Sequence, residues 1–66
     1  MKRISIDNGS HWTNPADALK EIDIDTMAVY MDDDTREAVH AELAPCSDVE
    51  FLTRYLELAA DDLIIG

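Results

Sequence analysis

The sequence predicts a small α+β domain with an N-terminal β-hairpin, about four short helices and a C-terminal strand that completes a three-stranded sheet. Three observations lead to this fold class. A short apolar alternation ends in Asn-Gly near the N-terminus, helix-capping residues recur along the middle of the chain, and three large apolar residues stand near its end. Because 66 residues support only one small core, we expect a single acidic domain over residues 1–66.

The N-terminal segment has the pattern of a hairpin. Ile4 and Ile6 alternate with polar residues, as in a strand with one buried face. Asn8 and Gly9 follow, and this dipeptide accommodates the positive φ angles of a two-residue hairpin turn. We therefore expect residues 11–13 to form the returning strand.

The first two helices are predicted from their capping residues. Asn14 can cap a helix whose first position is Pro15, because the N–H that proline lacks is not needed there. This helix should end near Ile22. Asp23 or Asp25 can cap a second short helix, since an aspartate side chain accepts hydrogen bonds from the free N–H groups of a first turn.

The third and fourth helices are predicted from two capping boxes. The first box is headed by Asp34, and its helix should end at Leu43 or one residue later, because the residue before Pro45 is disfavoured in the α region. The second box is headed by Ser47. Its helix should run from residue 48 to about residue 58.

The last element is predicted from burial alone. Leu63, Ile64 and Ile65 are three consecutive large apolar residues, which would be unfavourable in water. Pairing beside Ile4 and Ile6 is the simplest way to bury them. The chain end is therefore expected to be the third strand of the sheet.

Negative charge is the most informative feature of the composition. The chain has 15 acidic and 5 basic side chains, for a net charge of −10. Residues 21–66 hold thirteen of the carboxylates against Arg36 and Arg54, a net of −11, whereas residues 1–20 have a net of +1. Such a field repels nucleic acids and anionic membranes and attracts basic surfaces. We therefore expect a basic protein partner, and neither direct nucleic-acid binding nor membrane binding.

Catalytic and metal chemistry have little support. One cysteine, Cys46, and two histidines are too few for a structural zinc site, which uses four ligands at set spacings. Residues 32–34 lack the ligand spacing and glycine of a calcium loop. A chain of this length also has little room for a deep catalytic cleft. We expect no enzyme activity, no catalytic residue, no metal site and no cofactor.

The acidic side chains exceed what helix capping needs, because one aspartate suffices at each helix start. A compact chain of this length is about 28 Å wide, and duplex DNA carries roughly 16 charges over that span. The fifteen carboxylates are comparable in number. We therefore expect them to imitate DNA in front of a basic groove. The candidate partner-binding residues are Asp32, Asp33, Asp34, Glu37, Glu42, Asp48, Glu50, Glu57, Asp61 and Asp62.

The chain also resembles a known group of proteins. The N-terminal MKRISIDNG and the run ELAPC…EFL…YLELA…DLIIG resemble small acidic anti-CRISPR inhibitors of type I-C systems, which bacterial mobile elements such as phages carry. The resemblance implies an inhibitor that blocks target-DNA binding by a CRISPR surveillance complex of the Cascade type. It also implies action in the cytoplasm of the bacterial host. We further expect a monomer.

Two other functions remain open at the level of sequence. One is an antitoxin-like or regulatory module that neutralises a basic protein that does not bind DNA. The other is a small enzyme or metal protein. Competition by duplex DNA would separate the first from a DNA mimic, and a metal analysis would test the second.

Overall fold

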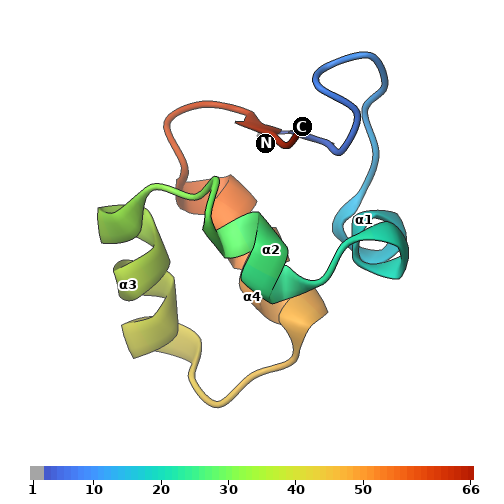
Figure 1. Ribbon diagram of the computed structural model, residues 1–66. Coiled ribbons are helices and arrows are strands. Elements are labelled where there is room, and N and C mark those ends of the chain that lie inside the picture. The colour runs from blue at the N-terminus through green and yellow to red at the C-terminus, as the bar shows by residue number, and fades with distance from the viewer. Residues whose placement is uncertain (1–2) are drawn as a thin grey trace.

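Four helices and two short strands make up the fold of the residues that the structure describes. A computed structural model describes residues 3–66, whose Cα atoms extend over 31 × 23 × 20 Å. Helix α4 lies at the centre with α3 packed on one side and α1 on the other, and the strands lie together at one end (Figure 1). In chain order the elements are β1 (Ile4–Ser5), α1 (Pro15–Glu21), α2 (Ile24–Ala28), α3 (Asp33–Leu43), α4 (Asp48–Leu58) and β2 (Leu63–Ile64).

Each helix begins where a side-chain oxygen accepts a hydrogen bond from a backbone N–H of the first turn, a group with no partner inside the helix. These capping residues are Asn14 for α1, Asp23 for α2, Asp32 for α3 and Ser47 for α4. The predicted caps at Asn14 and Ser47 are confirmed, and Asp23 is the one used of the two alternatives for α2. The expected range of α4, residues 48–58, is also confirmed.

The predicted start of α3 is wrong by two residues. Asp32, and not Asp34, accepts hydrogen bonds from the backbone N–H and the hydroxyl of Thr35, both at 2.9 Å. The reason is tertiary. The backbone N–H of Asp32 donates to the phenol oxygen of Tyr55 on α4 at 2.8 Å, which holds Asp32 in extended conformation against the neighbouring helix.

The three-stranded sheet and the N-terminal hairpin are also wrong. The sheet has two strands, β1 and β2, which are parallel, with Ile4 opposite Leu63 and Ser5 opposite Ile64. Within residues 3–66 the returning segment is reduced to a single antiparallel bridge between Ile4 and Thr13. The C-terminal strand therefore pairs with β1 as expected, but among the described residues no second strand completes a hairpin.

Side-chain hydrogen bonds explain why the hairpin does not form. Asn8 and Gly9 do adopt the positive φ angles of a tight turn, 57° and 88°. However, the hydroxyl of Ser5 accepts from the N–H of Gly9 at 2.8 Å, and the Asp7 carboxylate accepts from the N–H of His11 at 2.8 Å. These bonds hold the segment from Ser5 to His11 in a loop closed by side chains. The tight turn itself forms, with the carbonyl of Asp7 accepting from the N–H of Ser10 at 3.2 Å, but the chain does not return as a strand and β1 pairs with β2.

This loop predicts a measurable pH dependence. Hydrogen bonds from the backbone and ring of His11 and from Ser5 lower the pKa of Asp7 from 3.8 to about 2. Because the folded-state pKa is the lower one, the Asp7 carboxylate stabilises the fold above pH 4, and this contribution is lost as the pH falls towards 2. We expect Asp7→Asn to lower the melting temperature at pH 7 and to reduce its fall between pH 4 and 2. If the melting temperatures of the two proteins fall by the same amount between pH 4 and 2, this assignment is wrong.

The core lies between the helices and one face of the strand pair. Helix α4 contributes most to it, with Leu52, Tyr55 and Leu56 buried. Each other layer adds at least one fully buried side chain: Ile4 from β1, Ala18 from α1, Met27 from α2 and Val39 from α3. Because α4 packs against α1 and α3, its position fixes where the acidic outer faces of these helices point.

Candidate partner-binding surface

The structure leaves the predicted acidic residues on the outside of the molecule. All ten candidates are exposed except Asp62, which is half-buried. They come from α3, α4, the segment before α3 and the segment that joins α4 to β2. Some of these side chains have structural partners, and others do not. That distinction decides which of them a partner protein can use.

Six of the candidates hold the fold together or are partly neutralised. Asp32 caps α3, and the carboxylate of Glu50 accepts a hydrogen bond from the hydroxyl of Ser47, the residue that caps α4. The other four form ion pairs. Two of these pairs, those of Glu42 and Asp62, join residues far apart in the chain, so the sequence does not reveal them. The four pairs are Asp33 with Arg36 at 3.1 Å, Glu42 with Arg54 at 3.0 Å, Glu57 with Arg54 at 3.6 Å and Asp62 with Arg3 at 3.0 Å.

The remaining four candidates are Asp34, Glu37, Asp48 and Asp61. Within residues 3–66 their carboxylates make no hydrogen bond or ion pair with another side chain. An exposed carboxylate of this kind keeps its full charge and its hydrogen-bond acceptors for a partner. These four residues form the free acidic set.

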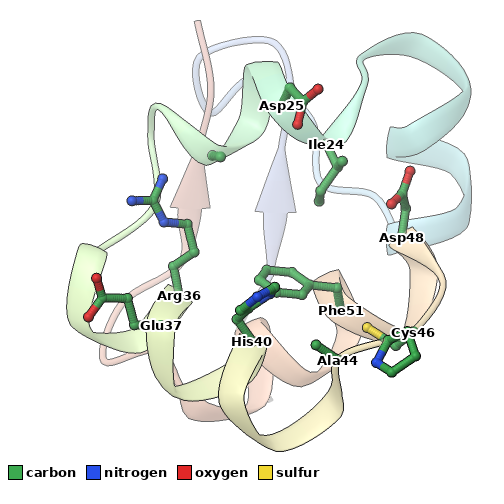
Figure 2. Close-up of a pocket in the computed structure, with 11 residues that line it drawn as sticks. Ile24, Asp25, Arg36, Glu37, His40, Ala44, Cys46, Asp48 and Phe51 are labelled. Atoms are coloured by element: carbon green, nitrogen blue, oxygen red, sulfur yellow. The ribbon is translucent and has the colours of Figure 1, made fainter.

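Two members of the free acidic set border a groove between α2, α3 and α4 (Figure 2). The groove has a volume of about 550 Å³. Glu37 lines it from α3 and Asp48 from the start of α4, and Asp25 from α2 adds a third carboxylate. Figure 2 shows the ring of Phe51 at the centre of the groove, with Ile24 pointing towards it.

Sequence reasoning missed this groove and the position of Asp25 at its edge. It treated Asp25 as a possible helix cap, but the cap of α2 is Asp23, so the Asp25 carboxylate is exposed and has no partner among the described residues. The position of α2 over α3 and α4 is a tertiary feature. The one local signal was the pair Asp23 and Asp25. Because only one of them can cap α2, the other carboxylate had to be free for another contact.

A second hollow collects a different group of candidates. It has a volume of about 520 Å³ and is bordered by Asp32, Asp61 and Asp62. Tyr30 and Ile64, two of the exposed large apolar side chains, also line it. Apolar side chains therefore interrupt the acidic surface at both hollows, so the surface is not uniformly charged.

Among residues 3–66, no three Asp, Glu, His or Cys side chains are grouped so that they could hold a metal ion. In the same part of the chain, none of the helices has the length and apolar character needed to cross a membrane.

Comparison with protein families shows to which family the chain belongs. The family described as anti-CRISPR protein AcrIC5 matches residues 20–58, more than half of the 66 residues. The chain belongs to the AcrIC5 family. No curated protein and no solved structure matches it significantly. The family confirms the resemblance to type I-C anti-CRISPR inhibitors, and it identifies the chain as an anti-CRISPR inhibitor that acts on a CRISPR–Cas complex.

The AcrIC5 match covers the helical part of the molecule. It runs from the last residues of α1 to the end of α4 and omits both strands. It includes every candidate partner-binding residue except Asp61 and Asp62. The groove between α2, α3 and α4 lies entirely inside the matched segment.

Proposed function

We propose that this AcrIC5-family protein inhibits a type I-C surveillance complex of the Cascade type by acting as an acidic DNA mimic. Its exposed carboxylates occupy the basic groove that would otherwise bind target DNA. The observation that carries this proposal is the free acidic set, four exposed carboxylates from α3, α4 and the following segment that no described side chain neutralises. The inhibition involves no covalent chemistry.

The dimensions and charge of the molecule support the proposal. Its longest extent is 31 Å, and duplex DNA carries roughly 18 phosphate charges over that length. The chain places 15 carboxylates within it, with a net charge of −10. A protein surface built from lysine and arginine to hold phosphates would meet a comparable number of negative charges here.

The energetic cost of the charge points in the same direction. Like charges repel and destabilise a compact state, and a net charge of magnitude about 2 to 8 already serves solubility in a small domain. This chain exceeds that range, and no basic side chain among the described residues pairs with the free acidic set. A binding role for the charge accounts for this excess. No observation favours the antitoxin-like alternative over it.

A salt series tests the electrostatic part of the proposal. Affinity for the purified type I-C surveillance complex should fall as salt rises, because screening and counterion return weaken contacts between charged surfaces. We expect a loss of at least about tenfold between 50 and 200 mM salt, by comparison with proteins that contact several phosphates. Isothermal calorimetry or biolayer interferometry measures it. Affinity that stays constant over this range would rule out an electrostatic mimic.

A further inference from the structure

We propose that the groove between α2, α3 and α4 receives one arginine side chain from the partner protein. This inference rests on the proposed function only in taking the partner surface to be basic. It goes further because it adds one contact that depends on shape to a binding surface whose affinity the proposed function attributes to charge alone. The groove would then act as an anchor point, and the free acidic set would supply long-range attraction.

The inner part of the groove suits the stem of a long side chain. Ile24 and Ala28 from α2 and Phe51 from α4 line it, and all three are only half-buried. Figure 2 shows that Phe51 lies between α2 and α3 and not beneath either helix. The aliphatic part of an arginine or lysine side chain gains free energy by covering apolar surface of this kind while its charged end stays near water.

The edge of the groove suits a cationic group. Asp25, Glu37 and Asp48 stand around it on three different helices, and none has a partner among the described residues. Arg36 also lines the groove, but its guanidinium already pairs with Asp33 at 3.1 Å. Three carboxylates and one guanidinium leave a local charge of −2 with His40 neutral. An anionic ligand or a purely apolar helix would therefore be disfavoured.

Arginine fits this combination better than lysine. Its planar guanidinium stacks on aromatic rings and forms two parallel hydrogen bonds with a carboxylate, whereas the lysine ammonium is a strongly hydrated point charge. Phe51 offers the ring, and the three carboxylates offer acceptors. A cation over an aromatic ring is attracted to the electron-rich face of the ring, more strongly as water is excluded.

The chain itself contains one arginine held in this way. The guanidinium of Arg3 lies 4.0 Å from the centre of the Trp12 ring and pairs with the Asp62 carboxylate at 3.0 Å. An aromatic ring and a carboxylate together thus bind an arginine on this surface already. The groove offers the same two chemical groups, and Arg36, which also lines it, is already paired with Asp33.

A groove-filling variant tests the inference without changing any charge. Ala44 is exposed, lies outside the helices and lines the groove, so Ala44→Leu should occupy space that the arginine needs. Ala41→Leu is the matched control, because Ala41 is exposed on α3 and does not line the groove. At fixed salt, we expect Ala44→Leu to bind the surveillance complex about tenfold more weakly and Ala41→Leu to bind within about twofold of the parent, as for loss of one interface anchor.

The outcomes separate this inference from the proposed function. If Ala44→Leu binds like the parent while affinity still falls with salt, the arginine anchor is wrong and mimicry stands. If Ala44→Leu weakens binding while affinity is insensitive to salt, the anchor stands and electrostatic mimicry fails. Circular dichroism of both variants verifies that they remain folded.

A second measurement needs no surveillance complex. In ¹⁵N-labelled protein, N-acetyl-arginine amide should shift the amide signals of Ile24, Ala28 and Phe51, and N-acetyl-lysine amide should shift them less. Ala44→Leu should abolish these shifts. Equal shifts with the two probes, or shifts that do not gather at the groove, would overturn the assignment of an arginine.

Discussion

Replacing Glu37 and Asp61 by lysine is expected to weaken binding to the surveillance complex about 100-fold. Both carboxylates belong to the free acidic set, and neither caps a helix, so the change should leave the fold intact. Each substitution turns an attraction to the basic partner surface into a repulsion. A loss of about tenfold for each residue corresponds to about 1.4 kcal/mol, well within the cost of opposing like charges across an interface.

The control for this variant has the same net charge at another place. Glu37→Lys with Asp61→Lys changes the net charge from −10 to −6, since each substitution adds two charges. Asp17→Lys with Glu21→Lys also gives −6, but on α1. We expect the α1 variant to lose less than about tenfold, because distant charges act mainly through the screened overall field. Equal losses for both variants would show that total charge, and not the surface around α3 and α4, governs binding.

Leu52→Ala is expected to have the largest effect on stability. Leu52 is fully buried on α4 and belongs to the core cluster to which every other helix also contributes. Truncation of such a leucine costs about 2 to 5 kcal/mol, because apolar contacts are lost and a cavity remains. A domain of 66 residues has a free energy of unfolding of roughly 3 to 10 kcal/mol. The variant should therefore melt about 15 °C lower, or fail to fold at 37 °C.

Thermal unfolding followed by circular dichroism measures this effect. Val49→Ala on the same helix is the control, since Val49 is 42% exposed and its truncation should lower the melting temperature by only a few degrees. A melting temperature for Leu52→Ala close to that of the Val49→Ala variant would contradict the central role of α4 in the core.

The helices could be predicted because their determinants are local. Asn14, Asp23 and Ser47 each accept a hydrogen bond from an N–H three residues later, so sequence spacing alone reveals them. The start of α3 could not be read in this way. It depends on Tyr55, which lies 23 residues from Asp32 and selects one aspartate among three neighbours.

The sheet shows how a correct local signal can lead to a wrong topology. Asn8 and Gly9 form the turn that they predict, but Ser5 and Asp7 then accept the following N–H groups, and the chain does not return as a strand. The pairing of Ile4 with Leu63 joins opposite ends of the chain. Apolar pattern predicted that these residues would meet, but it carried no information on the number of strands.

The candidate surface could be predicted in composition but not in detail. Exposure of the carboxylates follows from their charge, because an isolated ion is costly to bury. Their pairing does not follow from the sequence, since Glu42 meets Arg54 from another helix and Arg3 meets Asp62 from the other end of the chain. The groove over Phe51 forms only where three helices pack together, so no single stretch of sequence predicts it.

Competition with target DNA is the most direct test of the account. The purified surveillance complex, loaded with its guide RNA, is mixed with labelled inhibitor, and unlabelled duplex carrying the matching target is added in increasing amounts. The account predicts that the duplex displaces the inhibitor and that excess inhibitor prevents duplex binding, because both occupy the same basic groove. A stable ternary complex of inhibitor, duplex and surveillance complex would contradict DNA mimicry and place the inhibitor at another surface.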